Sequence, residues 1–78
     1  MNETGEANVV DLGRAHAPWG KELLVQAVTY HSGMRLARLR IREGRRFTVL
    51  DLDAPTARWL TAALDNALSD GQPGQAAT

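Results

Sequence analysis

The sequence of 78 residues contains no cysteine, which excludes disulfides and thiolate metal sites as sources of stability. Its two histidines, His16 and His31, are too few for a typical zinc centre, so we expect no metal and no cofactor. No apolar run is long enough to cross a bilayer, and the first residues do not resemble a signal peptide. These absences predict a soluble, cytoplasmic protein with no membrane partner.

Catalytic motifs are missing as well. The chain has no G-x-S-x-G, no H-E-x-x-H, no P-loop and no G-x-G-x-x-G. Asp51 and Asp53 lie two residues apart, but Asp53 is better explained as a helix cap and Asp51 as the partner of a nearby arginine. We therefore expect that the protein is not an enzyme, has no catalytic residues and takes no small-molecule substrate.

The ends of the chain are poor in apolar residues. Residues 1–8 are polar, and residues 70–78 are rich in Gly, Gln and Ala, so we expect two disordered tails around one domain at residues 9–69. About 60 residues form a core of only marginal stability. Because neither disulfides nor metal can supplement this core, we predict that the protein is a homodimer.

Turn signals divide the domain into four strands and a helix. Asn8 to Leu12 reads as a short strand ended by Gly13, residues 14–20 as a loop, and Lys21 to Tyr30 as a longer strand. A hairpin follows over residues 35–52. The order predicts an α+β fold, with a four-stranded antiparallel sheet followed by one C-terminal helix.

The helix has a clear start and one apolar side. Asp53 is a favoured N-cap, and Pro55 in the first turn forfeits no needed hydrogen bond. Leu60, Leu64 and Leu68 recur every four residues and form an apolar stripe. This stripe is wide enough to cover the inner face of a small sheet.

The hairpin over residues 35–52 is strongly basic on one side. A two-residue turn at Glu43-Gly44 sets Arg40 opposite Phe47. Because side chains alternate along a strand, one face is apolar and the other is basic. The apolar, core-facing set is Ala37, Leu39, Ile41, Thr48, Leu50 and Leu52. The basic set is Leu36, Arg38, Arg40, Arg42, Arg45, Phe47, Val49 and Asp51.

The register of the strand over residues 21–30 depends on the turn that follows it. With Ser32-Gly33 as a two-residue turn, Leu24, Gln26, Val28 and Tyr30 share the core face of the hairpin. A three-residue turn exchanges this set with the alternate residues of the strand. The sequence leaves both registers open.

The basic face has two interpretations. Charges on an exposed strand often only keep a protein soluble and guard a sheet edge, although lysine and mixed signs are usual there. Here arginine dominates, and Arg38, Arg40 and Arg42 are about 7 Å apart along one strand, near the phosphate spacing of an extended single strand. Phe47 beside them offers a ring for base stacking.

Several motifs resemble a known family. Trp19-Gly20-Lys21-Glu22-Leu23, the V-x-Y-H-S-G segment into R-L-A-R-L-R-I-R-E, and V-L-D-L before a helix are similar to the bacterial branch of the transcriptional positive-cofactor-four family. PUR and Whirly domains share a related topology and the same ligand class. The resemblance spans about residues 9–69, but the chain is poorer in lysine than that family, and Gly44-Arg45-Arg46 replaces its lysine-glycine pair.

The resemblance implies a curved four-stranded sheet with one helix, and two copies paired through helices and sheet ends. It implies that single-stranded DNA lies across the exposed sheet, and it adds Trp19 and Lys21, which match DNA-facing residues of the family. We expect binding of single-stranded DNA, or of RNA, with little sequence specificity, in transcription (a coactivator-like role) or DNA maintenance in bacteria. The alternative is a protein-interaction module of the same fold. The expected nucleic-acid-binding residues are Trp19, Lys21, Arg38, Arg40, Arg42, Arg45 and Phe47.

Overall fold

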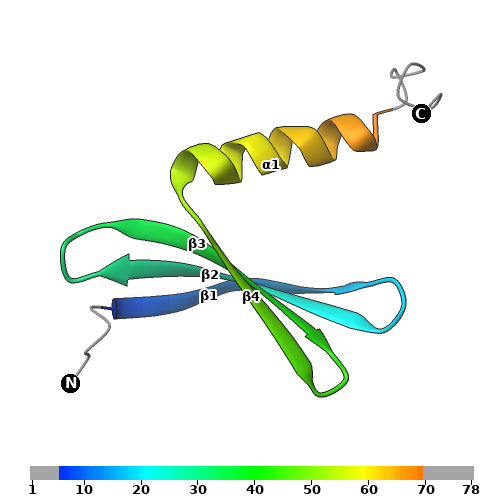
Figure 1. The fold of residues 1–78 in the computed structure, drawn as a ribbon, viewed down its shortest axis with the longest axis horizontal. Coiled ribbons are helices and arrows are strands. Elements are labelled where there is room, and N and C mark those ends of the chain that lie inside the picture. The colour runs from blue at the N-terminus through cyan, green and yellow to red at the C-terminus, as the bar shows by residue number, and fades with distance from the viewer. Residues whose placement is uncertain (1–5, 70–78) are drawn as a thin grey trace.

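The structure, a computed structural model, describes residues 6–69, so the two predicted tails lie largely outside the described residues. It contains four strands and one helix: β1 (Glu6–Ala17), β2 (Lys21–Tyr30), β3 (Arg35–Glu43), β4 (Arg46–Leu52) and α1 (Ala54–Ala67). The strands form one antiparallel sheet in the order β1-β2-β3-β4, followed by the helix (Figure 1). The predicted α+β fold is confirmed.

Strand β1 is much longer than the sequence predicted. It begins at Glu6, inside the expected tail and ahead of the expected domain boundary at residue 9, and it continues to Ala17 through the expected loop. Gly13 does not end the strand, because an irregularity between Asp11 and Gly13 absorbs one extra residue and pairing with β2 then resumes. The loop between β1 and β2 is reduced to three residues, 18–20.

The two hairpin turns fix the faces of the sheet. A three-residue turn joins β2 to β3, because Tyr30 N–H donates to the Met34 carbonyl at 2.8 Å. The two-residue alternative was therefore wrong, and Leu24, Gln26 and Val28 lie opposite Arg40, Arg38 and Leu36. This set belongs to the basic side of the sheet.

The turn between β3 and β4 contains Gly44 and Arg45, one residue later than predicted. Glu43 pairs with Arg46, and Gly44 has φ +62°, as expected for the first central residue of a type II′ turn. Arg42, not Arg40, is directly opposite Phe47. Since the register between β3 and β4 moves by two residues, the side chains of these two strands keep their predicted faces.

The sheet therefore has two contrasting faces. We call one the arginine face; it is formed by alternate residues that include Arg14, Glu22, Leu24, Gln26, Val28, Arg38, Arg40, Arg42, Phe47, Val49 and Asp51. We call the other the apolar face; it includes Val10, Ala15, Leu23, Val25, Ala27, Ala37, Leu39, Ile41, Thr48, Leu50 and Leu52.

The buried side chains lie on the unexpected face. Among the described residues, only Leu24, Gln26 and Val28 are buried, and all three are on the arginine face. Their direct partners on β3 are Arg40, Arg38 and Leu36, and long arginine side chains cover apolar surface with their aliphatic stems. The predicted core face stays open, with Val25 and Leu50 40% and 46% exposed.

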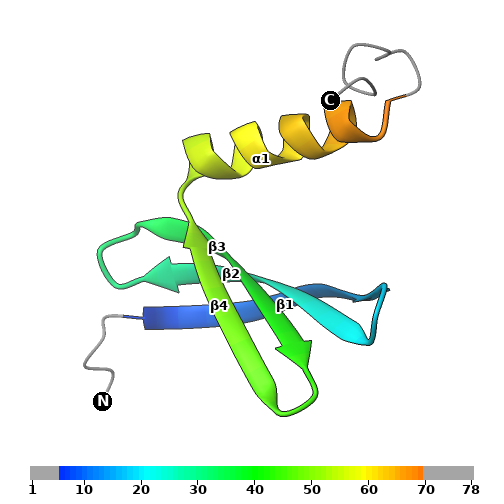
Figure 2. The same ribbon diagram turned by 45° about the vertical axis from the view of Figure 1, so that its right-hand side comes forward.

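Helix α1 starts as predicted but does not cover the sheet. Asp53 accepts a hydrogen bond from the Thr56 N–H at 3.0 Å. The helix follows β4 after this single residue, contacts β3 and β4, and extends beside the sheet without any buried residue (Figures 1 and 2). Leu64 and Leu68 are 56% and 84% exposed, so the predicted covering of the inner face by the apolar stripe is wrong for a single chain. At 14 residues, the one described helix is too short to cross a membrane.

Candidate nucleic-acid interface

The arginine face is organised in rows that run across the four strands. Antiparallel pairing places each row side by side, because directly paired residues share a face. Three consecutive rows contain the charged residues. They are His16-Glu22-Arg42-Phe47, Arg14-Leu24-Arg40-Val49 and Asp11-Gln26-Arg38-Asp51, each in the order β1 to β4.

In the row that contains Arg38, the positive charge is more than balanced, because Asp11 and Asp51 lie in the same row as this one arginine. The Arg38 guanidinium donates to Asp51 at 2.8 Å through Nε and to Glu6 at 2.9 Å through Nη2. These hydrogen bonds, to Asp51 first and Glu6 second, raise the pKa of Arg38 above its ordinary value. Gln26 in the same row donates to the Asp11 carboxylate at 2.8 Å, which satisfies this buried amide. The predicted pairing of Asp51 with a nearby arginine is confirmed, and of the two candidates, Arg35 and Arg38, the partner is Arg38.

The row that contains Arg42 is also balanced. Arg42 contacts the Glu22 carboxylate through Nε at 2.9 Å and through Nη2 at 2.8 Å. The hydrogen bond from Arg42 lowers the pKa of Glu22, and the positive charges of Arg42, Arg14 and His16 add to the effect. Glu22 is therefore ionised at neutral pH, and it cancels much of the field of Arg42.

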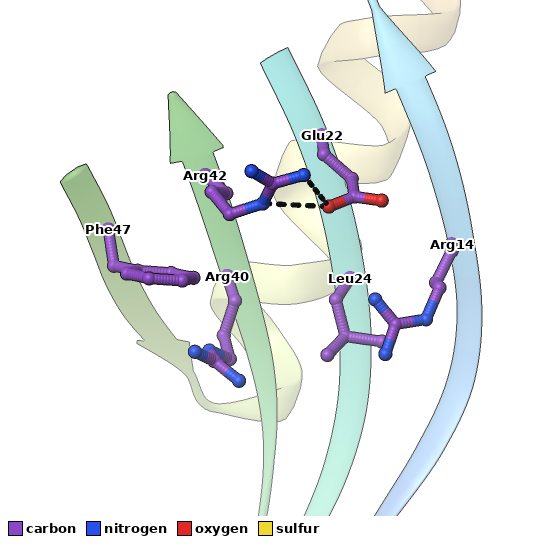
Figure 3. A pocket seen from close by; sticks show the side chains of 6 residues that line it. All are labelled: Arg14, Glu22, Leu24, Arg40, Arg42 and Phe47. Atoms are coloured by element: carbon purple, nitrogen blue, oxygen red, sulfur yellow. Dashed lines mark hydrogen bonds and ion pairs between the residues drawn. The ribbon is translucent and has the colours of Figure 1, made fainter. Parts of the chain in front are cut away.

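The middle row is different, because it contains two arginines and no acid. Within residues 6–69, neither Arg14 nor Arg40 forms an ion pair with a carboxylate. Two strand spacings separate their backbones, which is about 10 Å. Figure 3 shows the two guanidinium groups on either side of Leu24.

Arg40 also stacks on an aromatic ring from the neighbouring row. Its guanidinium carbon lies 4.8 Å from the centroid of the Phe47 ring, within the range of a cation–π contact. Phe47 is 55% exposed, so part of the ring remains accessible. The predicted closeness of Arg40 and Phe47 is present, although the two residues are diagonal neighbours.

These side chains surround a shallow hollow of about 210 Å³, lined by Arg14, Glu22, Leu24, Arg40, Arg42 and Phe47 (Figure 3). Small-molecule sites usually enclose about 300–1,000 Å³. The hollow therefore suits one flat or anionic group of a ligand that continues across the surface. Figure 3 shows helix α1 behind the strands, on the other side of the sheet.

Three predicted site residues lie away from this hollow. Lys21 belongs to the apolar face and is 3.3 Å from the Glu43 carboxylate. Arg45 lies in the turn between β3 and β4. Trp19 lies in the loop between β1 and β2, is 87% exposed, and has φ +64°, a conformation that bulky residues rarely adopt.

Sequence reasoning missed Arg14. The residue was assigned to a loop, because Gly13 was interpreted as the end of a strand. An alternating pattern with an irregularity at Gly13 would have placed Arg14 and His16 on one face. The predicted site thus contracts to Arg40 and Phe47, with Arg14 added and with Arg38 and Arg42 already engaged by carboxylates.

No group of three or more His, Cys, Asp or Glu side chains in the described range is arranged to hold a metal ion. The site offers guanidinium groups and one aromatic ring. Such groups bind anions and stack on flat rings.

Comparison with known proteins gives one match. A family model described as a family of unknown function matches residues 6–70, which is most of the chain. No curated protein matches the sequence. No solved structure matches it either.

Proposed function

Because the chain belongs to DUF6967, a family of unknown function, we propose a function from the geometry of the chain itself: the arginine face binds single-stranded nucleic acid, with DNA as the preferred ligand. The observation that carries this proposal is the middle row. Arg14 and Arg40 are free of carboxylate partners within the described residues, and Arg40 lies against an exposed Phe47 ring.

The proposed mechanism combines charge and stacking. Arg14 and Arg40 contact successive parts of a phosphate backbone, since guanidinium groups bind phosphate through two parallel hydrogen bonds. A base stacks on the exposed surface of the Arg40–Phe47 pair, which contributes about 1–3 kcal/mol per base. Phosphate and stacking contacts read little sequence, so specificity is low. Trp19, exposed at the loop tip, is a second stacking candidate.

The ion pairs of the arginine face limit the expected affinity for nucleic acid. Arg38 and Arg42 are engaged by Glu6, Asp51 and Glu22, so they neutralise few phosphates. A single-stranded ligand then contacts about two free cations of one chain, and the affinity depends on salt with a slope of about −1.4 on logarithmic axes. This dependence is much weaker than six free arginines would produce.

The test is a fluorescence titration of a labelled oligodeoxythymidine at two salt concentrations. Arg40→Met should weaken binding about 5-fold to 50-fold and reduce the salt slope by about 0.7, because one phosphate contact is lost. Arg58→Met, on the exposed side of helix α1, is the matched control and should leave both quantities unchanged. Equal affinity of wild type and Arg40→Met, or no binding by the wild type, would refute the proposal.

The ion pairs favour a second candidate, in which the arginine face docks an acidic protein segment. A peptide carboxylate needs less net positive potential than a nucleic-acid backbone, and the acids in the outer rows of this face leave no excess of arginine there. A poly-glutamate peptide that displaces the oligonucleotide, and binds more tightly than it does, would favour this candidate. We propose likewise that the protein acts in the cytoplasm and that its resemblance to the positive-cofactor-four family reflects a shared class of ligand.

A further inference from the structure

We propose that two copies of this chain form a symmetric dimer in which helix α1 of each copy covers the apolar face of the other copy's sheet. The proposal concerns the side of the sheet opposite the arginine face. It is therefore independent of the proposed nucleic-acid binding.

The first argument is the nearly absent core of the single chain. Only three described side chains are buried, and none of them is in the helix. The radius of gyration is 15.5 Å, whereas a compact domain of this length has about 11 Å. A domain with so little burial cannot offset its loss of conformational entropy.

The second argument is that two unpartnered surfaces match each other. On the sheet, Val10, Val25 and Leu50 are 40–46% exposed, and their neighbours on the apolar face are mostly aliphatic. On the helix, Leu64 and Leu68 are 56% and 84% exposed. Interface cores are poor in charged residues, and so is the centre of the apolar face.

The third argument is the short connection between the sheet and helix α1. Asp53 alone separates β4 from helix α1, and its side chain caps the helix. This short, capped junction fixes the direction of the helix and keeps its apolar stripe off its own sheet (Figures 1 and 2). Within residues 6–69, no segment covers the stripe. A second copy brings both a stripe and an apolar face, and twofold symmetry satisfies both at once.

The fourth argument is size. Four strands span about 19 Å and six residues along β2 about 20 Å, so the apolar face measures roughly 400 Å² in projection. A helix of 14 residues is about 21 Å long and 10 Å wide, which gives roughly 200 Å². One helix covers about half of this face, so each copy buries roughly 200 Å² of helix and 200 Å² of sheet in projection. Because the accessible area exceeds the projected area, the contact lies at the lower end of specific interfaces, which bury about 800 Å² per partner.

The experiment measures the mass of the full chain by sedimentation equilibrium at about 1–100 µM. The wild type should sediment as a dimer, twice the chain mass of 8.5 kDa. Val25→Asp on the apolar face should raise the dissociation constant at least about 100-fold, because the interface would bury a charge. The matched control is Val49→Asp on the arginine face, where Val49 is 53% exposed, and it should leave the dimer unchanged. A monomeric wild type would overturn the proposal.

A crosslinking experiment tests the arrangement without relying on a destabilised variant. Since the chain has no cysteine, single cysteines can be placed at will. A tagged Leu64→Cys chain is mixed with an untagged Val25→Cys chain under mild oxidation. The two should form a disulfide-linked heterodimer, recognised by a mass equal to the sum of one tagged and one untagged chain. If Leu64→Cys links only to itself, the helices pair with each other and the proposed arrangement is wrong. If no product forms, a second copy does not cover the apolar face.

Discussion

Arg38 is held by two carboxylates at once, and its position shows how one residue ties distant parts of the chain together. Glu6 lies 32 residues away in sequence and Asp51 13 residues away, and the Arg38 side chain is only 18% exposed. The guanidinium therefore connects the first strand of the sheet to the last, and two other strands lie between them. Removing one partner of such a partly buried ion pair costs more than it does at an exposed surface, because the remaining charge is poorly solvated.

Arg38→Met should destabilise the protein by about 1–3 kcal/mol, because Asp51, only 34% exposed, would lose its counter-charge and Glu6 would lose one of its contacts. The free energy of unfolding from urea denaturation, at one fixed protein concentration, measures this loss. Arg42→Met is the comparison, since the Arg42 side chain is 47% exposed and should lose less. An equal or larger loss for Arg42→Met would contradict this account of the arginine face.

At the scale of elements, the turns and the helix junction define the register and the direction of each segment. Gly44 requires a left-handed backbone, whereas Gly13, in the irregular part of β1, has no such φ and has open space around its α-carbon. The two glycines therefore have different structural roles, although the sequence presents both as turn signals.

Gly44→Ala should destabilise the protein by about 1–2 kcal/mol, since a side chain at φ +62° is strained. Gly13→Ala should be neutral or stabilise by up to about 1 kcal/mol, because alanine restricts the unfolded chain without a clash. Thermal unfolding followed by circular dichroism distinguishes the two variants. A reversal of their order would show that the turn after β3 does not have the described conformation.

The helix cap gives the protein a defined response to acid. Hydrogen bonds from Thr56, first from its side chain and then from its backbone N–H, lower the pKa of Asp53, so the folded value lies below the unfolded value of about 3.8. Stabilisation by the Asp53 carboxylate is complete above its unfolded-state pKa and is lost as the pH falls through its lower pKa in the folded state. Asp53→Asn keeps a good cap without this titration. The free energy of unfolding of this variant should match that of the wild type at pH 7 and fall less between pH 4 and 2. If the two curves of unfolding free energy against pH are parallel, the Asp53 carboxylate is not the cap that titrates.

For the whole molecule, folding and association are expected to be linked. If the apolar face is covered only in the dimer, the folded state is stabilised by mass action. The midpoint of thermal unfolding should therefore rise by about 5–10 °C between 2 and 200 µM protein. The measurement is differential scanning fluorimetry over a dilution series. A midpoint that stays constant over this range would mean that the single chain is stable with its apolar face exposed.

The sequence by itself determined the fold class, the alternation of each strand and the start of the helix. Each of these depends on local chemistry: side chains alternate along strands, Gly44 permits a tight turn, and Asp53 caps a helix that begins with Pro55. A shift of two residues in the last hairpin left every face unchanged, since the period of a strand is two. Alternation together with a two-residue turn is therefore enough to place Arg40 and Phe47 on one face of the hairpin.

Only the tertiary structure decided which face is buried and which arginines are free. The turn before β3 has three residues instead of two, and this one-residue difference moved Leu24 and Val28 to the arginine face. The irregularity at Gly13 brought Arg14 into the site. Ion pairs join residues far apart in sequence, so local patterns do not predict that Glu6 neutralises Arg38. Register, irregular pairing and long-range charge contacts depend on the whole sheet, and a linear pattern does not contain them.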